Sequence, residues 1–140
     1  MIRGLSHMTF IVADLDKATL FFEKIFDAKE VYASGDQTFS LAEEKFFLID
    51  DIWIAIMKGE TPLQKTYNHI AFKIETDDFE HYYARIQALG LEIKETRPRI
   101  SGEGESIYFY DFDQHLFELH TGTLGTRLEA YNKQNKDGKI

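Results

Sequence analysis

The stretch Ser106–Gly122, SIYFYDFDQHLFELHTG, decides how the rest of the chain is interpreted. Two apolar runs flank an Asp-rich segment, a pattern that predicts a β-hairpin. The two-residue period of the second run places one carboxylate, Glu118, at a buried position. Burial of an unpaired carboxylate is strongly unfavourable. Glu118 is therefore expected to meet a cation, to accept several hydrogen bonds or to bind a metal ion.

The composition restricts the classes of protein to which the chain can belong. Its 140 residues, 44% of them hydrophobic, suffice for the core of one ordinary domain. No stretch is long and apolar enough to span a bilayer, and we expect a soluble, cytoplasmic protein without a targeting signal. The net charge of −8 argues against nucleic acid and anionic membranes as partners. Because the chain has no cysteine, a metal site must use histidine and carboxylate ligands.

The first half of the chain predicts one strand, one helix and then a set of short strands. The first strand is expected over Leu5–Ala13, and the helix over Leu15–Phe26, with Asp14 as its N-cap. Short strands are expected at about residues 30–33, 38–41, 45–49 and 52–57. The polar segment Lys58–Lys65 then predicts a linker.

The second half repeats this order. A strand over Tyr67–Glu75 precedes a helix over Phe79–Leu89, which Asp77 and Asp78 are expected to cap and Gly90 to end. A strand at about 91–96, a loop at 97–105 and the hairpin complete this half. A short helix at about 124–131 and a frayed polar tail at 132–140 are expected at the end of the chain.

This repetition predicts an α+β fold of paired βαβββ modules in a single domain, residues 1–140. Module 1 is expected at about 4–58 and module 2 at about 66–122, followed by the short helix and the tail. The spacing of matching residues supports a duplication. His7 and His69 are 62 residues apart, and Asp14 and Asp77 are 63 apart.

Two histidines, His7 and His69, stand out because they lie near the start of the first strand of each module. Together with Glu118 they form a set of ligands that suits Mn²⁺, Fe²⁺ or Zn²⁺. Ala55 occupies the position equivalent to Glu118, so a fourth ligand is missing and space is left for substrate and water. Spacing alone does not decide between two interpretations. One is this metal site, and the other is a pair of core histidines beside a Glu118 that forms a salt bridge. The remaining histidines are interpreted as ordinary structural residues: His81, His115 and His120.

A resemblance to a known family rests on the segments GLSHMTFIV, IWIAIM, YNHIAF and GEGESIYFYDFDQHLFELHTG and on the later TRL. These segments extend over nearly the whole chain. Through them the protein resembles the fosfomycin-resistance branch of the vicinal oxygen chelate (glyoxalase-like) superfamily. The run TFSLAEEKFFLID is most similar to the X-type, epoxide-hydrolase members. The resemblance implies a Mn²⁺-dependent enzyme that opens the epoxide of fosfomycin with water. The product would be an inactive diol, which would confer antibiotic resistance.

The resemblance also implies roles for individual residues. His7, His69 and Glu118 would bind Mn²⁺, and Glu44 would be the base that activates water. Without the resemblance, Glu44 would be assigned to a solvated turn. The residues that would bind the phosphonate or line its site are Thr9, Trp53, Tyr67, Arg97, Ser106, Tyr108 and Arg127. The family further implies a homodimer in which modules of different chains complete each site.

Other functions stay open at this point. A thiol transferase would attack the same epoxide with glutathione or another low-molecular-weight thiol. A metal-free drug-binding protein, similar to the bleomycin-binding relatives, would leave its ligand unaltered. A metal-dependent isomerase or dioxygenase acting on another substrate would also use the same ligands.

Overall fold

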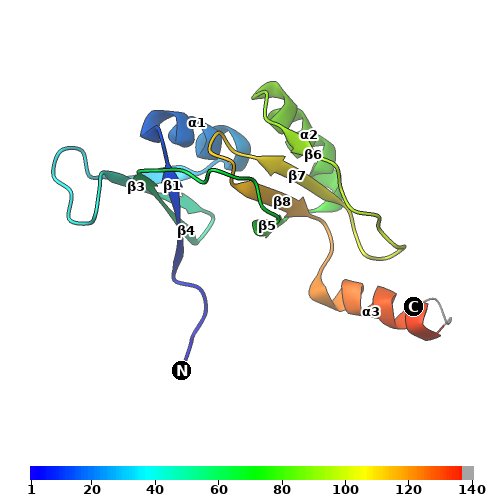
Figure 1. Cartoon of the computed structure of the whole chain (residues 1–140). Coiled ribbons are helices and arrows are strands. Elements are labelled where there is room, and N and C mark those ends of the chain that lie inside the picture. Colours follow the sequence, from blue (N-terminus) through cyan, green and yellow to red (C-terminus); the bar gives the residue numbers. More distant parts are fainter. Residues whose placement is uncertain (137–140) are drawn as a thin grey trace. The chain divides into compact units, whose positions relative to one another are not determined.

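The computed structural model describes residues 1–136, which form two compact units, each with a four-stranded mixed sheet (Figure 1). Unit 1 comprises Met1–Lys65 and Asp111–His115, and unit 2 comprises the other described residues. The order βαβββ occurs in each unit, so the predicted α+β class and repeated modules are confirmed. The last part of the predicted frayed tail, residues 137–140, lies outside the described residues. No helix within residues 1–136 is long and apolar enough to cross a membrane.

Unit 1 contains one helix and four strands. Its elements are β1 (His7–Val12), α1 (Leu15–Phe26), β2 (Lys29–Ala33), β3 (Glu44–Ile49) and β4 (Ile52–Lys58). The strand order is β1-β4-β3-β2, with β1 parallel to β4 and the other pairs antiparallel.

Helix α1 begins and ends where the sequence predicts. The Oδ1 atom of Asp14 accepts hydrogen bonds from the N–H groups of Asp16 (2.9 Å) and Lys17 (3.1 Å), which otherwise lack helical partners. The buried side of the helix packs on the sheet (Figure 1). The rings of Phe22 and Phe47 stack there with centroids 5.5 Å apart. Because α1 packs on one face of the sheet, the side chains of the opposite face can serve a site.

One expected strand, at about residues 38–41, does not form. The hydroxyl of Thr38 donates to the carbonyl of Ala42 (2.7 Å) and accepts from the N–H of Ser40 (3.2 Å). This side chain closes a local turn that competes with strand pairing. Phe39 and Leu41 are exposed in the resulting loop. Three strands, not four, therefore follow the helix in unit 1.

Unit 2 repeats the arrangement with shorter elements. They are β5 (His69–Lys73), η1 (Thr76–Asp78), α2 (Phe79–Ala88), β6 (Ile93–Lys94), β7 (Ser106–Tyr110), β8 (Leu116–His120) and α3 (Leu124–Lys136). The strand order is β5-β8-β7-β6, and β5 runs parallel to β8. The tip of the β7–β8 hairpin, residues 111–115, belongs to unit 1.

Three expectations for unit 2 need correction. Asp77 and Asp78 do not cap α2 with their side chains; they form the 3-10 turn η1, which leads into the helix. The strand expected at about 91–96 is reduced to the two residues of β6. Helix α3 is longer than expected and includes residues 132–136, which the sequence assigns to a frayed tail.

In unit 1, the strand register places the predicted site residues on one face of the sheet. Directly paired residues of neighbouring strands point to the same side. His7 pairs with Trp53, and Thr9 pairs with Ala55. Glu44 shares this face because it pairs with Met57, two residues along β4 from Ala55. The opposite face carries the core residues that meet α1.

In unit 2, the register repeats this pattern. Ala71 pairs with Glu118, and Glu118 pairs with Tyr108. In unit 1, Ala55 is likewise the middle residue of a row, between Thr9 on β1 and Phe46 on β3. The equivalence of Ala55 and Glu118 that the sequence spacing predicts is therefore confirmed.

Candidate metal and anion site

Glu118 is 4% exposed on β8 and lies among donors of unit 2. Its Oε1 atom is 2.9 Å from Nε2 of His69, and its Oε2 atom accepts a hydrogen bond of 2.6 Å from the hydroxyl of Ser106. The Nη2 atom of Arg99 is 3.5 Å from Oε2. The carboxylate thus has the cation and hydrogen-bond donors that its burial requires.

Both predicted histidine ligands hold their Nδ1 atoms against a neighbouring oxygen. Nδ1 of His69 is 2.7 Å from the carbonyl oxygen of Tyr67, which can only accept, so Nδ1 carries a proton. Nδ1 of His7 is 3.0 Å from the hydroxyl of Ser6, and the His7 ring stacks on Trp53 with centroids 4.2 Å apart. Because Nδ1 of each ring is engaged in a hydrogen bond, Nε2 is the nitrogen left to bind a metal ion; only in His69 does the partner place the proton on Nδ1, because the hydroxyl of Ser6 can donate as well as accept. These donors fit a divalent cation.

The three predicted ligands fall into two groups. His69 and Glu118 are in contact in unit 2, whereas His7 lies in unit 1. Residues 1–136 contain no cluster of three or more histidine, aspartate or glutamate side chains that could hold a metal ion. Two of the predicted ligands therefore lie in unit 2 and the third lies in unit 1.

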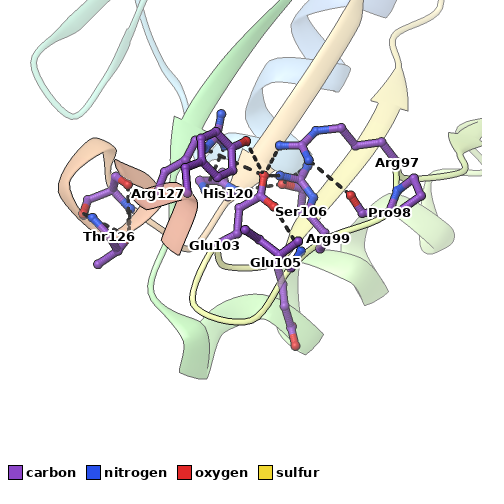
Figure 2. Close-up of polar contacts among 12 residues, drawn as sticks. Arg97, Pro98, Arg99, Glu103, Glu105, Ser106, His120, Thr126 and Arg127 are labelled. Carbon is purple, nitrogen blue, oxygen red and sulfur yellow. Dashed lines mark hydrogen bonds and ion pairs between the residues drawn. The ribbon is translucent and has the colours of Figure 1, made fainter. Parts of the chain in front are cut away.

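Arg99 is the arginine that contacts the side chains around Glu118. The sequence does not predict it as a site residue. Its Nη2 atom donates to the hydroxyl of Ser106 (2.9 Å; Figure 2). The same atom donates to the hydroxyl of Tyr108 (3.0 Å). Arg97, the arginine that the resemblance favours, instead donates to Glu103 and to the carbonyl of Pro98. The only sequence signal for Arg99 is its position two residues after Arg97, and an irregular loop has no period that would tell which side chain faces the sheet.

The hydroxyl of Ser106 links Glu118 to His120. Because this hydroxyl has one proton and donates it to Glu118, its contacts with Arg99 and with Nδ1 of His120 (2.7 Å) must be donations from those groups. Burial lowers the pKa of His120, which favours the neutral ring. Its Nε2 atom then accepts from Nη2 of Arg127 at 3.4 Å. His120 is hydrogen-bonded, as its interpretation as a structural residue requires, and it also orients a site hydroxyl.

Tyr67 and Tyr108 form a pair of hydroxyls beside the ligands. Their oxygens are 3.0 Å apart, and the ring of His69 lies edge-on to Tyr108 at 5.4 Å. Burial and the hydrogen bond with Tyr67 raise the pKa of Tyr108 above its usual value. Tyr108 therefore stays protonated and can donate a hydrogen bond to an anion.

Glu44 is a second buried carboxylate, in unit 1, and is 8% exposed. Its backbone N–H donates to the hydroxyl of Ser34 (3.0 Å), but within the described residues its side chain has no hydrogen bond and no ion pair. The neighbouring Glu43 is exposed. An accessible lone pair on a positioned carboxylate is what a general base requires. Burial and strand register distinguish Glu44 from Glu43.

Close packing of backbones holds the loop that carries Arg99. At Gly104, where φ is +94°, an added Cβ would lie 2.7 Å from the backbone nitrogen of Gly122. At Gly102, where φ is +87°, the nearest atom to such a Cβ is Cβ of Ala130, at 3.6 Å. The two glycines thus share the left-handed conformation, but a backbone neighbour blocks a side chain only at Gly104.

We expect Gly104→Ala to reduce the free energy of unfolding by about 2–4 kcal/mol, because conformational strain and the clash with Gly122 add. Gly102→Ala is the matched control, which meets the strain without the clash and should cost about 1–2 kcal/mol. Urea unfolding followed by circular dichroism measures both. Equal losses in the two variants would contradict this description of the loop.

A family model describing the Glyoxalase/Bleomycin resistance protein/Dioxygenase superfamily matches residues 4–119. The fosfomycin resistance protein FosX of Listeria innocua is 60% identical over 133 residues, covering 95% of this chain and 100% of that protein. FosX of Mesorhizobium japonicum is 62% identical over 128 residues, covering 91% and 92%. The metallothiol transferase FosB of Shouchella clausii is more distant, at 37% over 142 residues, covering 98% and 92%.

Solved structures give the same result. A glutamate-to-glutamine variant of FosX from Listeria monocytogenes, complexed with Mn(II) and 1S,2S-dihydroxypropylphosphonic acid, matches with a TM-score of 0.86 and 56% identity, covering 94% of this chain and 99% of that one. The same protein complexed with Mn(II) and a sulfate ion matches with a TM-score of 0.85 and 56% identity, at the same coverage. The match extends over almost the full length of both chains.

Proposed function

The chain belongs to the glyoxalase/bleomycin resistance protein/dioxygenase superfamily and, within it, to the FosX fosfomycin resistance proteins, and from this premise we propose how its residues act. It is a Mn²⁺-dependent enzyme that adds water to the epoxide of fosfomycin and releases an inactive diol. One observation carries the site assignment: the ligand pair His69–Glu118 lies beside a cation and two hydroxyls suited to an anion. Hydrolysis of fosfomycin without any thiol, followed by phosphorus NMR, tests this function.

We assign Mn²⁺ to His7, His69 and Glu118. The Nε2 atoms of the two imidazoles and the buried carboxylate support this set, which also suits the preferences of Mn²⁺ for nitrogen and oxygen ligands. The bound ion would supply a Lewis acid that polarises the epoxide C–O bond. The contact of Glu118 with His69 places both side chains next to each other, which supports their binding one ion together.

We assign the phosphonate of the substrate to Arg99, Ser106 and Tyr108. The guanidinium of Arg99 and the hydroxyl of Tyr108 would bind such an anion through charge-assisted hydrogen bonds, and the hydroxyl of Ser106 could join them by turning its proton from Glu118 to the anion. Their mutual contacts of 2.9–3.0 Å support a common binding position. The other residues that the resemblance implies at the substrate stay in the proposal: Thr9, Trp53, Tyr67, Arg97 and Arg127.

We assign the activation of water to Glu44. Its burial without a counter-charge within the described residues leaves the carboxylate able to accept a proton. Glu44 shares its sheet face with His7 and Thr9, which supports a position near the ion and the substrate. Proton transfer from water to Glu44 would accompany attack of the water oxygen on the epoxide carbon and cleavage of its C–O bond. The resulting alkoxide would take up a proton from solvent and Glu44 would release its own, so that one water is added in all.

We further propose a homodimer in which unit 1 of one chain and unit 2 of the other complete each site. The division of the ligands between the two units is compatible with this arrangement. A cytoplasmic location is also proposed, and cell fractionation would test it.

Mixing two inactive variants tests the shared site. His7→Ala and Glu118→Gln, unfolded and refolded together in equal amounts, should regain about a quarter of the wild-type activity, because half of the dimers are mixed and each mixed dimer has one intact site. The control mixture, His69→Ala with Glu118→Gln, should stay inactive because both changes lie in unit 2. If each site is completed within one chain, the first mixture will also stay inactive.

Transfer of a thiol is the second candidate, which FosB at 37% identity supports more weakly. It predicts that fosfomycin opens only when glutathione or another low-molecular-weight thiol is present. A thiol adduct and a diol give different phosphorus signals, so the same assay separates the two reactions.

A further inference from the structure

Glu103, in the loop between β6 and β7, is a charged side chain that is only 1% exposed. Its Oε1 atom accepts hydrogen bonds from Arg97, from Nη1 of Arg99 (3.2 Å) and from the hydroxyl of Tyr131 (3.1 Å). Its Oε2 atom accepts from the backbone N–H of Ile100 (3.2 Å). Figure 2 shows Arg97 and Arg99 beside Glu103, with the Glu105 side chain pointing away. Glu103 is thus the centre of a hydrogen-bond network outside the ligand set.

The network keeps Glu103 ionised. Burial by itself would raise its pKa, but the hydrogen bonds from Arg97, Ile100 and Tyr131 lower the pKa to about 2. The carboxylate is therefore an anion at every pH at which the enzyme would work. Its charge is available to hold the arginines throughout that range.

Glu103 holds one end of the guanidinium whose other end reaches the site. Nη1 of Arg99 binds Glu103, and Nη2 binds the hydroxyls of Ser106 and Tyr108. Because a guanidinium is planar and rigid, fixing one nitrogen sets the direction of the other. The Nε atom of Arg99 is buried without a hydrogen-bond partner among the described residues, which is unfavourable. The contacts at its two terminal nitrogens must therefore maintain this orientation.

We propose that Glu103 is a positioning residue that directs Arg99 toward the anionic group of the substrate. This inference depends on the assignment of Arg99 to the phosphonate. Without the charge of Glu103, Nη1 of Arg99 loses its anionic partner, and the guanidinium can turn away from the hydroxyls of Ser106 and Tyr108. Substrate binding would then weaken, while the contact between Glu118 and His69 would remain.

A purely structural role is the alternative, because Glu103 also contacts helix α3 through Tyr131. Loss of a structural contact would reduce stability and affect all steps together. Loss of a positioning contact would raise KM selectively and would require Arg99. These outcomes can be measured separately.

The test uses full-length enzyme with Mn²⁺ and the variant Glu103→Gln, which keeps the shape of the side chain but removes its charge. KM for fosfomycin should rise about 10- to 100-fold, as expected for the loss of one charge-assisted contact, with kcat within about threefold of wild type. Mn²⁺ binding, followed by electron paramagnetic resonance of the free ion, should be unchanged. Glu105→Gln is the matched control, because this neighbouring carboxylate is exposed and only its backbone makes the contacts with Thr121; it should behave as wild type.

A double-mutant comparison decides whether Glu103 acts through Arg99. In an Arg99→Gln background, Glu103→Gln should raise KM by less than about twofold more, because the group that it positions is already gone. An unchanged KM in Glu103→Gln would overturn the proposal. So would an equal fold increase in KM when Glu103→Gln is made in the wild-type and in the Arg99→Gln enzyme. So would an equal rise in KM from Tyr131→Phe, which removes only the contact with α3. If Glu103→Gln does not fold, Glu103→Asp takes its place, because the side chain is one methylene shorter and the carboxylate lies farther from Arg99. The same outcomes then support or overturn the proposal.

The wild-type enzyme separates this inference from the function itself. If it opens fosfomycin and Glu103→Gln has the KM of wild type, only the positioning role fails. If the wild-type enzyme does not open fosfomycin, the proposed function fails. Mn²⁺ binding is measured separately, so a loss of bound metal cannot be mistaken for either result.

Discussion

Glu118→Gln is expected to abolish the opening of fosfomycin and to weaken Mn²⁺ binding at least about a hundredfold. Replacing even an outer partner of a metal ligand costs about 10- to 100-fold in affinity, and this change removes a ligand charge directly. The amide can still accept from Ser106 but cannot offer a second anionic oxygen toward His69. Calorimetric titration with Mn²⁺, together with phosphorus NMR of the reaction, measures both effects.

Asp113→Asn is the matched control for this variant. Asp113 is also buried, in the tip of the same hairpin, and accepts a hydrogen bond from the N–H of Ala13 (3.2 Å). Burial raises its pKa, so its neutral form is already favoured relative to an exposed aspartate. The control should bind Mn²⁺ as wild type does. Unchanged Mn²⁺ binding in Glu118→Gln would remove Glu118 from the ligand set.

Glu44→Gln is expected to reduce kcat for hydrolysis about 10²- to 10⁴-fold, the usual contribution of a general base. The amide cannot accept the proton of the attacking water at neutral pH. Mn²⁺ binding should be retained, because Glu44 is not one of the assigned ligands. Comparison of initial rates with calorimetric Mn²⁺ affinities separates the two properties.

The neighbouring carboxylate provides the control for Glu44. Glu43→Gln changes an exposed side chain and should leave the hydrolysis rate within about twofold of wild type, as surface substitutions usually do. The opposite result, with Glu43→Gln inactive and Glu44→Gln active, would move the base by one residue. Full activity of both variants would mean that another group activates water.

Periodicity predicts most of the fold because buried faces constrain strands and helices. Helix α1 and the β7–β8 hairpin, which carries Glu118, occur where expected because their apolar pattern is strong and their turns are marked by aspartates. The segment at 38–41 fails as a strand because Phe39 and Leu41 are apolar but unburied, and Thr38 closes a turn. Alternation alone cannot reveal this competition.

The site is predictable only where it lies on regular strands. The two-residue period and the repeat are sufficient to place Glu118, His7 and His69 as candidates. The contacts of Arg99 and Glu103 depend on an irregular loop, in which side-chain direction follows from packing of Gly104 against Gly122. The sequence predicts only a structural role for His120, because the pairing of β7 with β8 is what brings Ser106 next to it.

The central claim is that water, not a thiol, opens the epoxide at a site containing Mn²⁺. Phosphorus NMR of fosfomycin incubated with the enzyme and Mn²⁺, in buffer free of any thiol, tests it most directly. The fosfomycin signal is expected to be replaced by that of the dihydroxypropylphosphonate, and glutathione is expected to add no second product. An unchanged fosfomycin signal, with conversion only after a thiol is supplied, would contradict it.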